Sequence, residues 1–174
     1  MTNTVLDALK NRRSIRRYKA EQITEQELSA VLEAGIYAPT AKNLQSPLMV
    51  VVQDKETIAK LSRMNAAVMG NPDADPFYGA PTVVIVLADS GNPNGVADAS
   101  LVMGNLMNAA YGIGLGSCWI NRAREVFETE EGRALLRSWG VDDKYAGVGN
   151  CILGYPDCPH PEAKPRKENY VVRV

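Results

Sequence analysis

Histidine and cysteine are scarce in this chain of 174 residues, and the scarcity excludes several kinds of catalytic site. The chain has one histidine, His160, and three cysteines, none of them in a Cys-x-x-Cys pair. A metal site built on several histidines therefore lacks its ligands, and nothing marks the nucleophile elbow of a Ser-His-Asp triad. An odd cysteine count provides no disulfide framework and suits a reducing compartment. We expect no metal centre and no catalysis by histidine.

The sequence also lacks a strong charge imbalance and a long apolar run. Its net charge is -1 and its pI is about 5.9, which argues against a general nucleic-acid binder. No apolar run approaches the roughly 20 residues that span a bilayer, and the first residues do not resemble a secretory signal. With 45% hydrophobic and 22% charged residues, we expect a single folded domain over residues 1–174. We expect it in the cytoplasm, without nucleic-acid or membrane partners.

Apolar periodicity predicts alternating helices and strands along the chain. A capping box at Thr24–Glu27 and a capping aspartate, Asp54, mark the starts of two helices. The helix expected at residues 96–113 is apolar around most of its circumference, which indicates a central helix or a subunit interface. The extended end of the chain, residues 170–174, is a candidate for addition to a sheet edge. Helices are expected at residues 4–12, 25–36, 96–113 and 123–139 and after Asp54, and strands at 48–53, 82–88, 145–153 and before Ile120.

The most informative stretch is residues 12–17, which hold four arginines and a serine. Arginine offers a planar fork of donors that binds phosphate oxygens in pairs, and the Ser14 hydroxyl adds a short hydrogen bond. This composition predicts a phosphate site. The alternative is a solvated basic patch at a helix C-terminus, where cations complement the helix dipole.

Two further stretches have weaker signals for a planar ligand. The proline-bracketed loop at residues 38–47 carries the amides of Asn43 and Gln45, which suit the edge of a heterocycle, although such a loop is more commonly a simple turn. Residues 112–120 are rich in glycine but follow a helix and open a strand, which is the wrong order for a dinucleotide fingerprint. Glycines there would let a planar ligand approach the backbone, or would only cap the helix.

Four motifs, taken in order, resemble the FMN-dependent nitroreductase family. The first is the arginine-serine motif at residues 12–16, and the second is the loop at residues 39–47. The third is Gly114-Leu115-Gly116-Ser117-Cys118-Trp119, and the fourth is the late basic pair Lys164-x-Arg166. The resemblance covers most of the chain, and the first motif is its most specific part.

The resemblance implies an α+β fold with a mainly antiparallel central sheet flanked by helices, in an intertwined homodimer with FMN at the interface. It implies ping-pong hydride transfer from NADH or NADPH through flavin N5 to a nitroaromatic, quinone or similar acceptor, with no catalytic side chain. The phosphate and ribityl contacts would come from Arg12, Arg13, Ser14, Arg16, Lys164 and Arg166. Pro39, Thr40, Asn43 and Gln45 would contact the flavin from the other protomer, and the Gly116 and Ser117 backbone would lie near N5.

Other functions stay open at this point. A specialised flavoenzyme of the same fold, such as a dehydrogenase, a dehalogenase or a flavin-fragmenting enzyme, would carry the same motifs. A non-catalytic module that holds a phosphorylated ligand or RNA would need only the arginines. The chain is short for the family, and either Asn65 or Asn71 could supply a polar flavin contact from the region before residue 80.

Overall fold

A central antiparallel sheet organises the computed structural model, which describes residues 3–174. Its strand order is β1-β2-β4-β3, and every pair of neighbours is antiparallel. The pairing brings β3 from the later half of the sequence to one edge of the sheet, where β4 is the one strand of residues 3–174 that pairs with it. The strands are β1 (Leu48–Val52), β2 (Thr82–Asp89), β3 (Gly116–Ile120) and β4 (Tyr145–Gly154).

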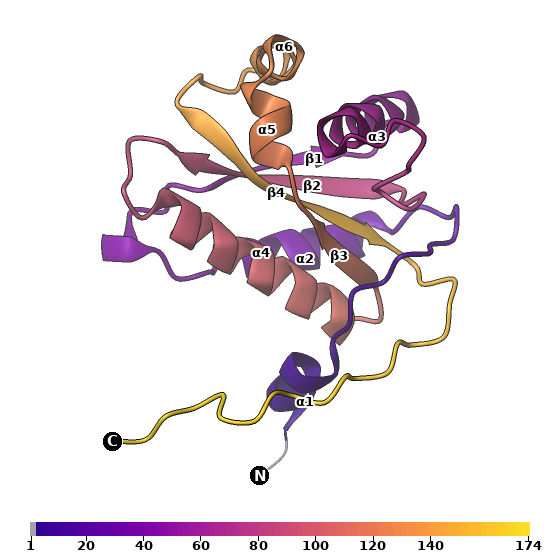
Figure 1. The fold of residues 1–174 in the computed structure, drawn as a ribbon, viewed down its shortest axis with the longest axis vertical. Helices are drawn as coiled ribbons and strands as arrows, with labels where there is room; N and C mark the ends of the chain where they lie inside the picture. Colours follow the sequence, from indigo (N-terminus) through magenta and orange to yellow (C-terminus); the bar gives the residue numbers. More distant parts are fainter. Residues whose placement is uncertain (1–2) are drawn as a thin grey trace.

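Helices cover both faces of this sheet (Figure 1). One apolar cluster lies under α2 and α4, and a second cluster packs α3, α5 and α6 against the other face. The predicted α+β class with a helix-flanked antiparallel sheet is confirmed. The helices are α1 (Thr4–Asn11), α2 (Glu25–Ile36), α3 (Lys55–Met69), α4 (Gly95–Gly112), α5 (Ala123–Glu128) and α6 (Glu130–Ser138), and a short 3-10 turn, η1, spans Ala41–Asn43.

The predicted helix starts are confirmed by their hydrogen bonds. The Thr24 hydroxyl accepts from the Glu27 amide (3.2 Å), and the Glu27 carboxylate accepts from the Thr24 amide (2.8 Å), which completes the capping box. Asp54 caps α3 by accepting from the Thr57 amide at 2.8 Å. These caps supply acceptors for amides that have no partner inside a helix.

The single helix predicted at residues 123–139 is wrong, because two helices occupy this range. Thr129 is extended (φ -69°, ψ 156°) and caps α6 by accepting from the Gly132 amide at 3.0 Å. Its hydroxyl also donates to the Val126 carbonyl at 2.7 Å. Threonine competes for backbone groups in this way, and the apolar periodicity continues across the break and hides it.

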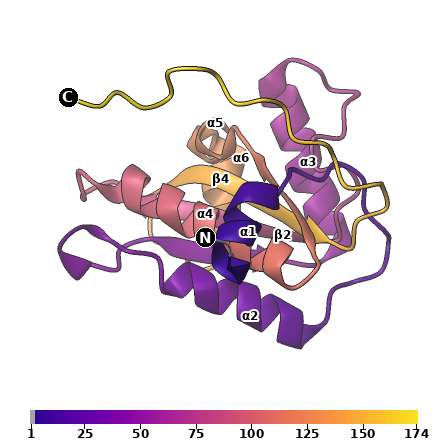
Figure 2. The ribbon, with the colours of Figure 1, turned by 90° about the horizontal axis from the view of Figure 1, so that it is seen from below.

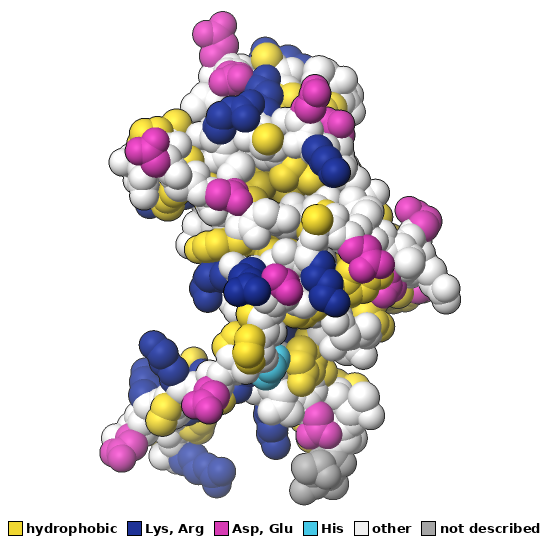
Figure 3. Space-filling view, turned by 90° about the vertical axis from the view of Figure 1, so that its right-hand side faces the viewer, with side chains coloured by type: hydrophobic (Ala, Val, Ile, Leu, Met, Phe, Trp, Pro, Cys, Tyr) yellow, Lys and Arg dark blue, Asp and Glu magenta, His cyan; other side chains and the backbone are white. Residues whose placement is uncertain are grey.

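Helix α1 and the chain after Tyr155 project away from the sheet (Figures 1 and 2). No residue of α1 is buried, and its Val5 and Leu9 are 67% and 55% exposed. Residues 170–174, expected to be extended and to suit a sheet edge, pair with no strand within residues 3–174. Figure 3 shows this projecting part as a lower lobe of the molecule with apolar and basic side chains. Among residues 3–174, no helix is long and apolar enough to cross a membrane.

Candidate functional site

The arginine stretch is fastened to the edge of the sheet by main-chain hydrogen bonds. The Ile15 amide donates to the Ser117 carbonyl at 3.0 Å, and Ser14 lies beside Ser117 in a short parallel bridge. Further along, the Lys19 amide donates to the Tyr155 carbonyl at 2.9 Å. The arginine-serine motif at residues 12–16 and the motif at residues 114–119 therefore lie side by side.

A cavity of about 490 Å³ opens next to this junction. Arg16 contributes to one wall, the segment from Cys118 to Arg122 to a second, and Asn65 of α3 to a third. Asn65 is 2% exposed and donates to the Asn121 carbonyl at 2.8 Å, which joins α3 to the chain after β3. The segment before β2 closes the cavity with Tyr78 and its neighbours. The volume is in the range of small-molecule sites.

Arg12 and Arg13 carry buried donors that the described residues do not satisfy. Arg12 Nη1 and Arg13 Nε are buried and have no hydrogen-bond partner within residues 3–174. Arg13 also donates through Nη1 to the carbonyls of Lys10 (2.8 Å) and Arg12 (2.7 Å) at the end of α1. Arg13 therefore partly caps α1, which agrees with the alternative interpretation of this stretch as a basic patch at a helix C-terminus. Unsatisfied buried donors are rare in native proteins, and on arginine they fit an anion.

Two titratable groups near this junction, Tyr18 and Cys151, are poor proton donors and nucleophiles. Tyr18 donates to the Ile15 carbonyl at 2.7 Å, and burial raises its pKa far above the ordinary value. Burial raises the pKa of the Cys151 thiol to about 12, so it remains protonated at neutral pH. The surroundings suit a bound group that brings its own chemistry. Within residues 3–174 no cluster of three or more His, Cys, Asp and Glu residues could hold a metal ion.

The loop containing Pro39, Thr40, Asn43 and Gln45 lies away from this cavity within one chain. Its Ala41 amide donates to Asp98 at the start of α4 (3.0 Å), whereas Ser117 contacts the Met107 carbonyl near the other end of that helix (3.5 Å). Asp98 and Met107 lie nine residues apart on this helix, or about 14 Å along its axis at about 1.5 Å per residue. The loop amides bond locally, since Gln45 Nε2 donates to Asn43 Oδ1 at 3.1 Å.

The tail returns to the arginine stretch, although its basic pair makes no direct contact there. His160 Nε2 lies 2.8 Å from the Asn11 carbonyl, and its ring packs near Tyr111. This contact brings the tail to the residue that precedes Arg12. Lys164 and Arg166 follow within six residues, are exposed, and form no ion pair or side-chain hydrogen bond within the described chain.

The structure places Gly116 and Ser117 behind the cavity wall. Both are buried in strand pairing, and a Cβ on Gly116 would lie 3.0 Å from the Ile15 side chain. That glycine is thus explained by packing against Ile15, whereas residues 118–122 line the cavity itself. The proposed backbone contact of Gly116 and Ser117 with a ring stays a prediction.

Asn65 is the residue that sequence reasoning left undecided against Asn71. Asn71 is exposed and outside the cavity lining, whereas Asn65 is buried and part of that lining. The sequence contains a signal that favours Asn65, because Asn65 shares a helical face with Leu61. A polar residue on the buried side of an amphipathic helix needs a hydrogen-bond partner.

Known proteins resemble this chain in sequence and in fold. A protein of Archaeoglobus fulgidus, provisionally named NADH dehydrogenase/NAD(P)H nitroreductase, is 31% identical over 87% of this chain and 84% of its own length. An NADPH-flavin oxidoreductase of Vibrio harveyi is 27% identical over 98% of this chain and 72% of its own length. The crystal structure of a nitroreductase with bound FMN from Bacteroides fragilis superposes with a TM-score of 0.91, is 31% identical, and covers 99% of this chain and 100% of its own. The sequence profile of the Nitroreductase family matches residues 9–155, and the chain belongs to that family.

Proposed function

We propose that this chain is an FMN-dependent NAD(P)H oxidoreductase with one flavin-binding domain over residues 1–174. The observation that carries the proposal is the pair of buried, unsatisfied arginine donors, Arg12 Nη1 and Arg13 Nε, in the same stretch as Arg16, which lines the cavity together with Asn65. The names of the relatives support a flavin and a nicotinamide reductant.

The residues present fit FMN. Arg12, Arg13, Ser14 and Arg16 would hold the phosphate and ribityl chain, because Arg12 Nη1 and Arg13 Nε need an acceptor and the described chain supplies none. Lys164 and Arg166 would add two further cations from the tail. Residues 118–122, Asn65 and Tyr78 form walls suited to a flat ligand.

The scarcity of acid and base residues in the chain indicates how the chemistry would be shared between the cofactor and the protein. Bound FMN would supply the acceptor and donor of hydride, which is the difficult chemistry of such enzymes. The protein would orient its ligands, exclude water and leave space for reductant and acceptor to occupy the site in turn. Neither step needs an acid or base from the protein, which agrees with the raised pKa of Tyr18. A nitroaromatic or quinone acceptor, and a cytoplasmic location, remain part of this proposal.

We also propose that the active unit is a homodimer. No residue of the loop at residues 39–47 lines the flavin cavity of its own chain, so its contact with flavin would have to come from a partner. Val96 and Leu101 of α4 are 63% and 48% exposed, and Val171 and Val172 of the tail are 73% and 82% exposed. Burying such surface is the main driving force for association.

The first prediction tests the phosphate site. We expect the double variant Arg12→Ala and Arg16→Ala to fold but to bind FMN at least about tenfold more weakly. Each charge-assisted contact that is removed contributes about 1.5–3 kcal/mol, and about 1.4 kcal/mol corresponds to a tenfold change in the dissociation constant. The measurement is the quenching of FMN fluorescence on titration with protein.

The matched control is Arg17→Ala in the same stretch. Arg17 forms an exposed ion pair with Asp157 at 3.0 Å and does not line the cavity, so this variant should bind FMN as the unaltered chain does. Tight FMN binding by the double variant, or equal loss in both, would contradict the assignment.

Reduction distinguishes an oxidoreductase from a module that only holds a phosphorylated ligand. We expect the yellow absorbance of the FMN-loaded protein to bleach on anaerobic addition of NADH or NADPH and to return with a quinone or nitroaromatic acceptor. Retained absorbance with both reductants would favour the binding module. Comparing free flavin, quinone and nitroaromatic acceptors would separate a general reductase from a specialised flavoenzyme.

A further inference from the structure

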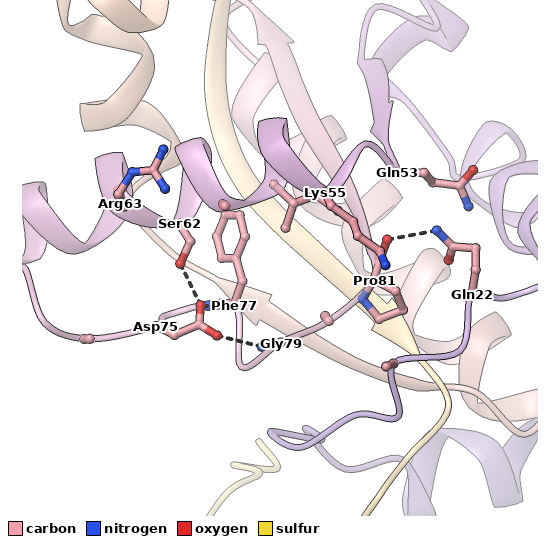
Figure 4. A pocket seen from close by; sticks show the side chains of 14 residues that line it. Gln22, Gln53, Lys55, Ser62, Arg63, Asp75, Phe77, Gly79 and Pro81 are labelled. Atoms are coloured by element: carbon pink, nitrogen blue, oxygen red, sulfur yellow. Dashed lines mark hydrogen bonds between the residues drawn. The ribbon is translucent and has the colours of Figure 1, made fainter.

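A second cavity, of about 430 Å³, lies between α3, residues 74–81 and residues 20–22 (Figure 4). Ala74 and Asp75 belong to its lining and also to that of the proposed flavin cavity. The two cavities therefore share part of one wall. None of the arginines at residues 12–17 lines the second cavity, so nothing in the proposed flavin chemistry explains it.

Its walls are mainly apolar and rigidly placed. Ile58, Phe77 and Ala80 are 9%, 2% and 2% exposed, so they belong to the core and present fixed surfaces to the cavity. Ala59 and Pro81 continue the apolar lining. Such a surface favours the hydrocarbon part of a ligand, because contact with it removes apolar area from water.

Most polar groups of the lining are already used in building it. The Asp75 carboxylate accepts from the Ser62 hydroxyl (2.6 Å) and the Gly79 amide (2.7 Å). Gln22 donates to the Pro81 carbonyl (3.0 Å) and accepts from the Thr82 hydroxyl (2.6 Å). Figure 4 shows the bonds of Asp75 at one end of the cavity and the bond from Gln22 to Pro81 at the other, where they hold residues 75–81 in place.

Two cations of α3 are the exceptions. Lys55 and Arg63 line the cavity, and neither has a carboxylate partner within the described residues, whereas Lys60 of the same helix pairs with Glu131 at 3.1 Å. Eight residues separate the two cations, or about 12 Å along the helix axis. Lys55 extends across the cavity toward Pro81 (Figure 4).

We propose that this cavity is a binding site for a small organic acid with an apolar body. The carboxylate pairs with Lys55, and the hydrocarbon part lies on Ile58, Ala59 and Phe77. Arg63 lies at the end of the cavity where the Asp75 carboxylate also lies (Figure 4), so these two charges offset each other and Lys55 supplies the preference for an anion over a neutral molecule. An apolar carboxylate matches both properties of the cavity, whereas inorganic phosphate matches only the charge.

The test is a calorimetric titration of the full chain, saturated with FMN, with 2-naphthoate and its neutral isostere 2-naphthamide. Naphthoate should bind about three- to fivefold more tightly than the amide, the scale of a partly exposed ion pair. Lys55→Gln should remove this preference, and Ala59→Leu should weaken both probes at least tenfold by filling the cavity. Lys60→Gln is the matched control and should change neither affinity.

Each other outcome overturns the proposal. Binding that survives Ala59→Leu, or a preference for the acid that survives Lys55→Gln, would place the probe elsewhere. Competition between naphthoate and NADH in steady-state rates would place it in the flavin cavity, and absence of binding would remove the site. FMN retention by the same protein tests the proposed function separately, so the two proposals can fail independently.

Discussion

The arginines at 12, 13, 16 and 17 lie in four different surroundings although they are close in the chain. Arg17 pairs with Asp157, and Arg13 donates to carbonyls at the end of α1. Arg12 keeps a buried unsatisfied nitrogen, and Arg16 lines the cavity. The Ile15 and Lys19 main-chain bonds fix the path of this stretch, so each side chain points to a different neighbour. The four arginines of this basic cluster therefore have separate roles.

At the residue scale, Asn65 should matter to the site and Asn71 should not. We expect Asn65→Ala to lower the free energy of unfolding by about 1–3 kcal/mol, because the Asn121 carbonyl loses its hydrogen bond. It should also weaken FMN binding, since Asn65 lines the cavity. Urea unfolding and FMN titration measure the two effects. Asn71→Ala is the control, and a larger loss of FMN in that variant would contradict the assignment.

At the scale of elements, the start of α3 depends on a single carboxylate, Asp54. The hydroxyl of Thr57 donates to the Asp54 carboxylate at 2.7 Å and its amide donates at 2.8 Å, which lowers the pKa of Asp54 below its ordinary value of 3.8. The unfolded chain therefore binds the proton more readily than the folded one. This contribution to stability is complete above pH 3.8 and is lost as pH falls through the folded pKa.

We therefore expect the free energy of unfolding to fall below about pH 4, and to fall less steeply in Asp54→Asn, which retains a capping oxygen but does not titrate. Urea unfolding from pH 6 to pH 2.5 measures both slopes. The Asp143 carboxylate beside Arg137 also has a lowered pKa, so some decline should persist in the variant. Identical slopes for the variant and the unaltered chain would show that this cap does not contribute.

The packing of α6 against α5 depends on Gly132. A Cβ there would collide with the Val126 carbonyl and would lie 2.8 Å from the Phe127 Cα. Gly132→Ala should lower the free energy of unfolding by about 1–3 kcal/mol, the usual cost of overpacking. Thermal unfolding with Gly112→Ala as control measures this, because nothing lies within 4 Å of a Cβ at Gly112. A stable Gly132→Ala would show that α6 shifts freely.

At the scale of the whole molecule, apolar surface projects where a partner would cover it. Helix α1 and the tail stand off the sheet (Figures 1 and 3), and the amides of the loop at residues 39–47 do not line the proposed flavin cavity of their own chain. We expect Leu101→Glu, on the exposed side of α4, to shift a dimer toward monomer by burying a charge in the interface. Light scattering coupled to gel filtration measures the mass.

FMN affinity should fall in the same variant, since the partner's loop would be absent from the site. Val51→Glu is the control, because Val51 is 37% exposed and lies on β1, which forms the edge of the sheet opposite β3. A dimeric Leu101→Glu, or a monomer that binds FMN as tightly as the unaltered chain, would contradict the proposed assembly.

Short-range chemistry made much of this protein predictable. The capping box at Thr24, the cap at Asp54 and the four strands depend on residues within a few positions of one another, and all were expected from the sequence. The break at Thr129 was missed because one hydroxyl competes with an otherwise continuous helical pattern.

The amino-acid sequence by itself determined the elements, the family resemblance and the residue types that suit a phosphate-bearing ligand. Only the tertiary structure decided which of those residues share a cavity. The strand order β1-β2-β4-β3 puts β3 at the sheet edge beside residues 14–15, and α3 then brings Asn65 to Asn121. These contacts join positions up to about a hundred residues apart in the chain. The sequence could not predict them, because burial and sheet pairing act between segments that are distant in the chain, whereas periodicity and capping motifs describe only neighbouring residues.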